Sequence, residues 1–303
     1  MNEFLATSPF DLYELSLFNL VVKHRSFTKA AEAAGLTQSA ITRQIQGIEN
    51  SLGIGLFERT TRSVNLTKAG EFLFQESSRL LGDVDQSLKR LREDFTNAKK
   101  EVRVGVSRSI SLAHLPGFFH ANLRQESKIG YHVSYQSSAE ILTRLEANEL
   151  DLGVLCPPSR LPQTLCITHR FTDAFTLIAP VELASQFTPL SKPAKNMWLS
   201  RQSWLLLDEN TNTGHKLRRW MASSNLKVEP AVQLDNFDLI ITLVSLGMGI
   251  SFVPIRALAL YGRKKRLVRL PLPHRFEREL VVLMRRHRKQ PKHLTEFVKN
   301  ILF

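Results

Sequence analysis

The chain has 303 residues, a length typical of about two domains and sufficient for a sizeable hydrophobic core. Hydrophobic residues make up 43% of it and charged residues 23%, which excludes a low-complexity or collagen-like protein. Lys and Arg total 41 against 28 Asp and Glu, so the formal net charge is +13 at pH 7. This basic balance favours nucleic acid as a partner, with a small anion as the alternative.

The cysteine content and the hydropathy pattern indicate the cellular compartment in which the protein acts. Two cysteines, Cys156 and Cys166, are too few for a disulfide framework and lack the spacing of metal ligands, so we expect no metal and no cofactor. The N-terminal segment has no basic stretch followed by an apolar one, so no secretion signal is expected. The longest uncharged run, residues 239–255, is shorter than the roughly 20 residues of a spanning helix. We therefore expect a cytoplasmic protein that does not enter a membrane.

Apolar residues recur with helical periodicity over about the first fifty residues. Ser26 is suited to cap one helix, Gly35 to end it, and Thr37 to cap the next. The predicted helices cover residues 12–22, 28–34 and 38–52. Two short helices joined by a tight turn that contains glycine form a helix-turn-helix unit. A short hairpin is predicted to follow, around the polar turn at residues 60–62.

One long helix is predicted from Thr67 to Phe95. Apolar residues recur in it at alternating steps of three and four, which is a heptad pattern, at Leu81, Val84, Leu88, Leu91 and Phe95. The pattern covers about two heptads, fewer than the three to four that indicate a coiled coil by themselves. A helix packed inside its own domain is therefore the alternative to a dimerisation helix.

Beyond residue 99, short apolar runs alternate with helical stretches. Strands are predicted at residues 102–106, 131–135, 152–155, 175–178, 204–207, 250–253 and 280–284, and helices near residues 112–124, 139–149, 215–223, 237–246 and 293–302. This alternation predicts a mainly parallel sheet covered on both faces, built as one large sheet or as two lobes that share a cleft. The expected domains are residues 1–67, the linker helix 68–98, and residues 99–303.

The segments SFTKAA, TQSAITRQI and LGIGLFERTTRSVNLTKAG, within residues 10–71, closely resemble the N-terminal signature of LysR-type transcriptional regulators. The resemblance implies a winged helix-turn-helix domain, pairing of linker helices, and a two-lobed α/β effector-binding domain similar to periplasmic solute-binding proteins. It also implies the partners: double-stranded promoter DNA with dyad symmetry, a small effector, and further copies of the chain in a homodimer or homotetramer. Contact with RNA polymerase is a further expectation.

The helix that begins after Thr37 carries side chains suited to reading bases. Arg43 can bind guanine with two hydrogen bonds, Gln38 can pair with adenine, and Thr42 can contact thymine. The resemblance places DNA contacts at Gln38, Ser39, Thr42 and Arg43. Helix-terminal residues suited to phosphates, and wing residues that approach the duplex, are Ser26, Thr28, Thr37, Arg59 and Arg62. A solvated helix face or a cap is the alternative for each of them, and for Arg59 an ion pair with Glu49 or Glu58.

Polar residues follow several predicted strands of the C-terminal region, where ligands of parallel α/β folds bind. They are Ser107, Arg108 and Ser109 after the first strand, Ser137 and Ser138 after the second, Cys156 after the third, and Asn212 and Thr213 after the strand at 204–207. Hydroxyl groups, amides and one arginine near helix starts suit a carboxylate or another small anion. A structural N-cap is the alternative for each serine.

The sequence leaves three other functions as alternatives to a LysR-type regulator, and it argues against an enzyme. Cys156 and Cys166 flank a proline-containing loop, so a thiol-based redox sensor of the same family is an alternative. The sequence holds no HExxH, GxSxG or GxxxxGK[ST] motif, so an enzyme is not expected. A solute-binding transport protein has no use for a helix-turn-helix, and a DNA-coating protein without an effector is a further alternative.

The positive charge is not concentrated at the helix-turn-helix. Residues 1–98 hold 11 Lys and Arg against 12 Asp and Glu, so a local positive field there depends on Arg43, Arg59, Arg62 and Lys68. Residues 256–292 hold 13 basic and 2 acidic residues. We interpret this basic segment as solvated surface, with a contact to bent DNA or to an acidic partner as the alternative.

Overall fold

The structure is a computed structural model. It describes residues 10–58, 64–96, 100–117, 119, 129–187, 190–226, 228–261, 266–271, 275–286, 291–299 and 301. The chain divides into two compact units, Met1–Ala98 with Ala147–Glu149 and Lys99–Glu146 with Leu150–Phe303. Within the described residues, no helix combines the length and the hydropathy that a bilayer span requires.

The first unit is helical, and its N-terminal helices confirm the predicted ones. They are α2 (Leu12–His24), α3 (Phe27–Ala34) and α4 (Gln38–Leu52), followed by the long helix α5 (Lys68–Phe95). Ser26, Thr37 and Thr67 each accept a hydrogen bond from the first turn of the helix that they precede. Gly35 ends α3 with a φ of +66°, a left-handed conformation that glycine adopts without strain. Local sequence signals thus account for the ends of these helices.

The helix-turn-helix packs around one small apolar cluster. Phe18 of α2, Ala30 of α3 and Ile41 of α4 are fully buried in it. Small alanines where α3 meets α4 let the two helices approach closely. The predicted hairpin is present at its base, where Phe57 and Leu66 form an antiparallel bridge. Its tip, residues 59–63, lies outside the described residues.

Helix α5 presents apolar side chains to solvent. In this single chain Leu88, Leu91 and Phe95 are 50%, 57% and 80% exposed, and Leu81 and Val84 are half-buried. Large exposed apolar side chains at heptad spacing on one side of a helix are typical of a surface that pairs with another helix.

The second unit is an α/β structure with two lobes. Its strands are β1 (Lys100–Ser107), β2 (Ile129–Gln136), β3 (Leu152–Leu155), β4 (Leu165–Pro180), β5 (Trp204–Leu207), β6 (Pro230–Leu234), β7 (Ser251–Pro254), β8 (Leu267–Leu270) and β9 (Glu277–Arg285). Its helices are η1 (Leu112–His114), α7 (Ser138–Glu146), α8 (Val181–Phe187), α9 (Lys192–Ser200), α10 (Asn212–Ser223), α11 (Phe237–Ser245), η2 (Arg256–Leu260) and α12 (Lys292–Lys299). The larger sheet has the order β2-β1-β3-β9-β4-β7, with β8 also paired to β4, and β5 pairs with β6.

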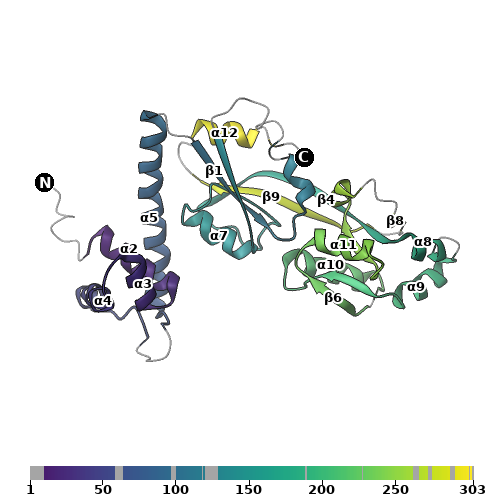
Figure 1. The fold of residues 1–303 in the computed structure, drawn as a ribbon, viewed down its shortest axis with the longest axis horizontal. Helices are drawn as coiled ribbons and strands as arrows, with labels where there is room; N and C mark the ends of the chain where they lie inside the picture. Colours follow the sequence, from purple (N-terminus) through teal and green to yellow (C-terminus); the bar gives the residue numbers. More distant parts are fainter. Residues whose placement is uncertain are drawn as a thin grey trace. The chain divides into compact units, whose positions relative to one another are not determined.

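The prediction of a mainly parallel sheet is wrong for this unit. Strand β1 runs parallel to β2 and β3, and β5 parallel to β6, but β9 is antiparallel to β3 and β4, and β4 is antiparallel to β7 and β8. The long strands β4 and β9 lie side by side and pass through both lobes (Figure 1). The structure therefore has two lobes, joined by a pair of antiparallel strands.

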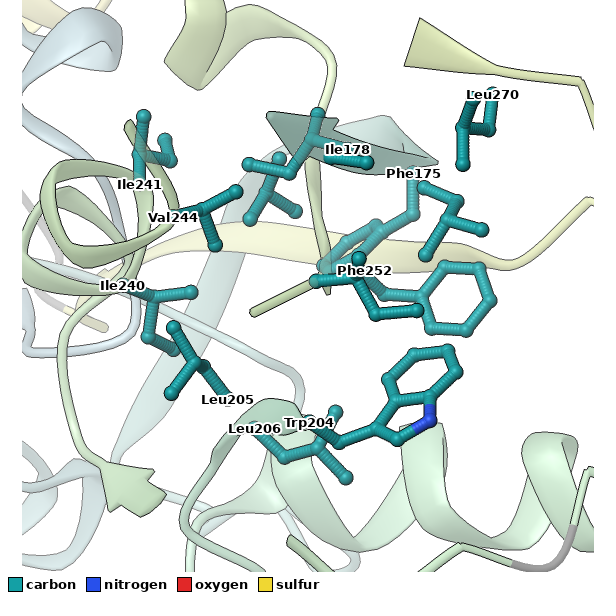
Figure 2. Close-up of a cluster of buried hydrophobic side chains, with 14 of the residues drawn as sticks. Phe175, Ile178, Trp204, Leu205, Leu206, Ile240, Ile241, Val244, Phe252 and Leu270 are labelled. Carbon is teal, nitrogen blue, oxygen red and sulfur yellow. The ribbon is translucent and has the colours of Figure 1, made fainter. Parts of the chain in front are cut away.

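Each lobe has its own core. In the first lobe α12 and α7 cover opposite faces of the sheet, with Phe297 of α12 against Tyr131 and Ile141 of α7 in a separate buried cluster (Figure 1). The second lobe packs around Trp204, which is 1% exposed (Figure 2). Two separately packed cores allow the lobes to act as distinct bodies on either side of a cleft.

Candidate functional site

Helix α4 separates an apolar side from a polar one. Ile41 and Ile45 are buried, whereas Gln38, Ser39 and Arg43 are exposed. Thr42 is half-buried, and its hydroxyl donates to the Gln38 carbonyl oxygen at 2.8 Å. The exposed side of α4 therefore presents three of the predicted base-reading residues together, with Thr42 beside them.

The predicted phosphate-contacting residues lie at helix starts. The Ser26 hydroxyl accepts from the Lys29 amide at 3.3 Å, and the Thr37 hydroxyl accepts from the Ala40 amide at 3.2 Å. Thr28 is exposed in the first turn of α3. A hydroxyl that accepts from its helix keeps a proton to donate, so capping and a phosphate contact are compatible.

Glu49 has a structural role at the base of the wing. Its carboxylate accepts from the amides of Leu56 and Phe57 at 2.6 and 3.2 Å. These bonds fix the end of α4 against the hairpin that follows it. The wing residues Arg59 and Arg62 lie outside the described residues.

In the second unit, the carboxyl ends of β1, β2, β5 and β6 surround a cavity of about 400 Å³ between the lobes. Its lining comprises Ser107, Arg108, Ser109, Gln136, Ser137, Ser138, Ala139, Leu142, Pro158, Ser159, Asp208, Asn210, Thr211, Asn212 and Asp235. Six of the eight residues predicted for an effector site are in this lining. The volume suits a small molecule. We call this cavity the interlobe cleft.

The charges of the interlobe cleft differ from the expected ones. Arg108 Nη1 lies 3.4 Å from Asp235 Oδ2, and both side chains are about half exposed. Asp208, whose carboxylate accepts from the Asn210 amide at 2.9 Å, adds a second acidic group. Asp235 was not predicted as a site residue, because it follows β6, a strand that was not predicted either. Asp208 directly follows the predicted strand at residues 204–207, and this position could have identified it as a site residue.

Ser137 is bound within a helix cap. Its hydroxyl donates to the Glu140 carboxylate at 2.8 Å and accepts from the Glu140 amide at 3.2 Å. Hydrogen bonds from the Ser137 backbone and side chain hold the pKa of Glu140 below its ordinary value. The structural role expected as the alternative for Ser137 is therefore present, beside the cleft that it also lines.

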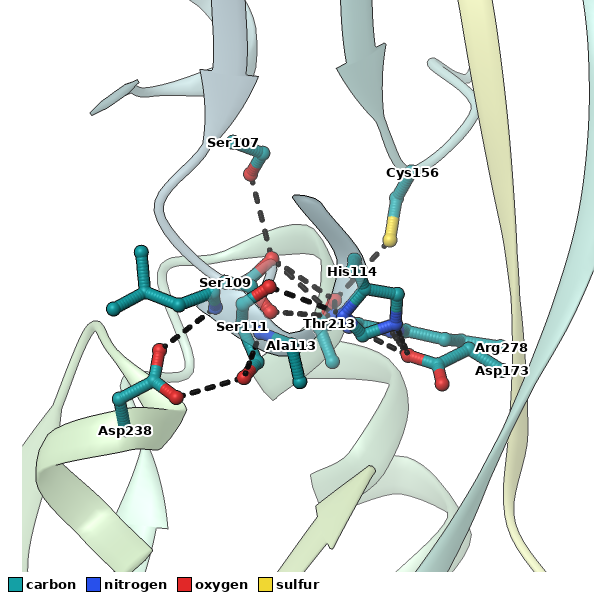
Figure 3. A network of polar contacts seen from close by, with 11 residues as sticks. Ser107, Ser109, Ser111, Ala113, His114, Cys156, Asp173, Thr213, Asp238 and Arg278 are labelled. Carbon is teal, nitrogen blue, oxygen red and sulfur yellow. Dashed lines mark hydrogen bonds and ion pairs between the residues drawn. The ribbon is translucent and has the colours of Figure 1, made fainter. Parts of the chain in front are cut away.

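Cys156 and Thr213, also predicted for the effector site, lie beneath the cleft and do not line it. They are 1% and 0% exposed, and the Cys156 sulfur lies 3.1 Å from the Thr213 hydroxyl. Thr213 also accepts from Arg278 Nη1 at 2.9 Å (Figure 3). These two residues connect the cleft to a buried polar network below it.

The centre of that network is a buried ion pair between β9 and β4. Arg278 is 2% exposed, and its Nε and Nη2 donate to Asp173 Oδ2 at 3.0 and 2.8 Å. Arg278 Nη1 donates to the Ser109 carbonyl oxygen at 3.0 Å, besides its bond to Thr213 (Figure 3). Ser109 belongs to the first lobe and Thr213 to the second. Arg278 therefore bonds to both lobes at the base of the cleft, and the interpretation of the basic segment as solvated surface is wrong for this residue.

His114 completes the network. Its Nε2 lies 3.3 Å from Asp173 Oδ2 and its Nδ1 lies 3.2 Å from the Ser111 carbonyl oxygen. Burial alone raises the pKa of Asp173, but the contact with His114 and the charge of Arg278 together hold that pKa below its ordinary value. We call Arg278, Asp173 and His114 the Arg278 cluster.

A second contact joins the lobes beside this cluster. Asp238 of α11 accepts from the Ser111 hydroxyl at 2.7 Å and from the Leu112 amide at 3.1 Å. Burial, with a smaller effect from the charge of Asp238, raises the pKa of Tyr135 to about 12. The loop that follows β1 is therefore bound to the second lobe at several points.

The two cysteines are far apart in the sheet. Leu155, which precedes Cys156, pairs with Val281 of β9, whereas Cys166 pairs with Met284 from the other side of β9. This register separates their Cα atoms by roughly 13 Å along the strands and about 10 Å across them. A disulfide requires Cα atoms within about 7 Å. Burial also raises the pKa of the Cys166 thiol, which lowers its reactivity.

Comparison with known protein families decides the classification. Residues 12–71 match the family model of the bacterial regulatory helix-turn-helix protein, lysR family, and residues 96–302 match that of the LysR substrate binding domain. The chain belongs to the LysR family of transcriptional regulators. This regulator is accordingly a DNA-binding protein with an effector-binding domain, and not an enzyme.

Two relatives illustrate the similarity of the regulator to named proteins. The probable RuBisCO transcriptional regulator of Thalassiosira pseudonana is 27% identical over 260 residues, which cover 82% of this chain and 83% of that protein. The RuBisCO operon transcriptional regulator of Allochromatium vinosum is 27% identical over 269 residues, covering 86% and 84% of the two chains.

Solved structures share the fold. A full-length OxyR variant from Pseudomonas aeruginosa superposes with a TM-score of 0.69 at 18% identity, covering 96% of the regulator and 94% of that chain. CbnR in complex with its target DNA superposes with a TM-score of 0.65 at 21% identity, covering 96% and 99% of the two chains. The winged helix-turn-helix and the two-lobed α/β domain predicted from the sequence agree with these structures.

The Arg278 cluster predicts a large effect of one substitution on stability. Asp173→Asn should lower the free energy of unfolding by about 3–5 kcal/mol, because it leaves the buried guanidinium of Arg278 without its anion. Urea denaturation of the full-length protein at pH 7 measures this loss. Because the folded-state pKa of Asp173 is lowered, its carboxylate stabilises the fold fully above about pH 5, and this contribution is lost as the pH falls below about pH 4. The difference between wild type and variant should therefore shrink in acid.

Asp235→Asn is the matched control, since it removes a carboxylate from a half-exposed pair with Arg108. Its cost should stay below about 1 kcal/mol. Equal losses for the two variants would contradict the role assigned to the buried pair.

Proposed function

We propose that this protein controls transcription from a promoter site of two-fold symmetry in response to a small polar effector that binds in the interlobe cleft. The observation that carries the proposal is the cavity of about 400 Å³ lined by Ser107, Arg108 and Asn212. The carboxyl ends of strands from both lobes meet there, so a ligand contacts the two lobes at once. A regulator with a cleft of this size has the means to sense a small molecule.

For the DNA contacts, we propose that Gln38, Ser39, Thr42 and Arg43 reach base edges in the major groove. Their position on the exposed side of α4 supports this assignment. Phosphate contacts are proposed for residues at helix starts and in the wing, namely Ser26, Thr28, Thr37, Arg59 and Arg62. Among the similar structures, CbnR is described with its target DNA and Vibrio fischeri DarR in complex with DNA.

For the assembly, we propose that α5 pairs with α5 of a second copy to form a homodimer, which can associate further into a homotetramer. The exposed heptad residues Leu88, Leu91 and Phe95 support this pairing, with Leu81 and Val84 continuing it. Two-fold symmetry of the dimer implies a pseudo-palindromic operator. The chain would act in the cytoplasm, where DNA is accessible, and contact with RNA polymerase would follow from promoter binding.

The effector class follows from the charges of the interlobe cleft. An anionic group of the effector would lie near Arg108 and the N-terminus of α7, as the sequence analysis expects. Asp208 and Asp235 oppose a purely anionic ligand and favour hydrogen-bond donors or a positive group at its other end. We therefore propose an effector that carries both an anionic group and donor groups. Redox sensing by Cys156 and Cys166 is the less favoured function, since the register holds them apart.

The proposed base contact of Arg43 is tested with operator variants. Arg43→Ala should weaken specific binding by about 1–3 kcal/mol and relax selectivity at one base pair in each half-site. Gel-shift titrations over a set of single-base operator variants measure both effects. Arg79→Ala, which removes an exposed arginine of α5, is the control and should leave binding unchanged. Equal weakening of every sequence by Arg43→Ala would show a phosphate contact, and a footprint with one unrepeated half-site would contradict the proposed dyad.

The proposed dimer is tested on α5. Leu88→Glu combined with Leu91→Glu should raise the dimer dissociation constant at least about tenfold, because it places charges in an apolar helix pair. Sedimentation equilibrium of the full-length protein measures this constant. Gln86→Glu, on the opposite side of the helix, should leave it unchanged. Unaltered association of the double variant would contradict pairing through this seam.

The proposed effector site is tested with a panel of amino acids and small hydroxy and dicarboxylic acids. A compound that fits the cleft should raise the thermal midpoint of the full-length protein. Arg108→Ala should weaken the affinity for that compound about tenfold, because it removes the anion-binding group. Arg170→Ala removes a similarly exposed arginine, paired with Glu279 at 2.8 Å, and is the control. Equal affinities of wild type and Arg108→Ala would remove Arg108 from the site.

A further inference from the structure

The second lobe contains a cavity that is separate from the interlobe cleft. It has a volume of about 450 Å³ and lies at strands β4, β7 and β8 and the start of β9. Its lining includes Phe175, Thr176, Phe252, Arg269, Arg275 and Phe276, and none of these residues lines the cleft. We call it the second-lobe cavity.

The base of this cavity is aromatic and firmly packed. Phe175, Phe252 and Phe276 are almost fully buried, and the rings of Phe175 and Phe276 meet edge to face with their centroids 4.8 Å apart. Trp220 supports Phe252 and Phe276 from α10, with ring centroids 5.0 and 5.6 Å away. Figure 2 shows Phe175 and Leu270 on the side of the cluster opposite Ile241. These rings are 2–6% exposed, so they give the cavity a rigid apolar base of which only a small part is open to a ligand.

The rim of the cavity is basic. Arg269 and Arg275 are exposed, and Arg269 Nε makes only a long contact, 3.5 Å, with the Thr176 hydroxyl. No carboxylate is among the described residues that line the cavity. Within the part of the chain that the structure describes, neither guanidinium forms an ion pair. The arginine of the interlobe cleft, in contrast, already faces Asp235.

We propose that the second-lobe cavity binds a small organic anion with an apolar body, such as an aromatic or branched monocarboxylate. The apolar body would lie against the small exposed parts of Phe175, Phe252 and Phe276 at the base of the cavity, and the carboxylate would bind Arg269 and Arg275. A planar guanidinium matches a carboxylate in geometry, and a site at the protein surface leaves the charged end of the ligand close to solvent. The volume lies within the range of small-molecule sites. This site goes beyond the effector cleft of the proposed function and is independent of it.

A ligand in the second-lobe cavity would lie close to the Arg278 cluster. The guanidinium carbon of Arg278 lies 5.3 Å from the centre of the Phe175 ring. Phe175 and Asp173 are two residues apart on β4, and Phe276 and Arg278 are two residues apart across the start of β9. A ligand on Phe175 therefore touches the ring over which the lobe-bridging arginine lies.

The test is a calorimetric titration of the full-length protein, without DNA, with phenylacetate as the probe. Phenylacetate should bind, and the double variant Arg269→Gln/Arg275→Gln should weaken its affinity at least about tenfold, because both charged hydrogen-bond donors are lost. Phenylacetamide, a neutral molecule of the same shape, should bind wild type at least about tenfold more weakly than phenylacetate. Both substituted arginines are exposed, so the variant is expected to fold, and its thermal midpoint in the absence of ligand verifies this.

Arg219→Gln, which removes an exposed arginine of α10 outside the lining, should leave phenylacetate affinity within about twofold of wild type. Absence of phenylacetate binding, or equal affinity in the double variant, would overturn the proposal. If Arg108→Gln weakens phenylacetate binding and the double variant does not, phenylacetate binds in the interlobe cleft. That result would also overturn the proposal. Operator binding, measured on the same preparations, reports separately on the proposed function.

Discussion

The arrangement of the effector-binding domain depends on one buried cation. The side chain of Arg278 is fully buried, so every donor of its guanidinium has to find an acceptor inside the protein. Asp173 supplies the charge, and Ser109 and Thr213 supply the remaining oxygens from opposite lobes. Moving the lobes apart at this point would leave a buried charge with unsatisfied donors, which is far more costly than losing an exposed pair. The base of the cleft is therefore the fixed point of the domain.

The rim of the cleft differs from its base. There Arg108 and Asp235 face each other across the opening while half exposed to water. Exposed pairs contribute little, so a ligand can replace this contact at small cost. A ligand that binds one lobe arrangement better than another shifts the population towards it, and the difference in affinity sets the size of the shift.

The helix-turn-helix was predictable because its helix ends depend on local sequence signals. Several features of the α/β domain were not, because they depend on residues that are distant in the sequence. Caps at Ser26 and Thr37 and the left-handed Gly35 act within a few residues, so α3 and α4 were predicted almost to the residue. Strand β4 was predicted only from Phe175, because its first half mixes polar and apolar residues and gains its order by pairing with β9. The short strand β6 was missed, and Asp235 with it. Arg278 resembles every other arginine of a basic segment, since its partner Asp173 is distant in sequence.

The structure shows that the basic residues behind the net charge of +13 have different environments. The helix-turn-helix side of the chain has no excess of basic residues, so the attraction to DNA that we propose there would depend on Arg43, the wing arginines and the amides at helix starts rather than on overall charge. In the basic segment at 256–292, Arg278 neutralises a buried aspartate, whereas Arg269 and Arg275 stand at the rim of an aromatic cavity. An arginine that is already paired binds an anion only by giving up its partner. The two cavities differ in this respect, because Arg108 in the interlobe cleft faces Asp235, whereas no carboxylate is among the described residues that line the second-lobe cavity.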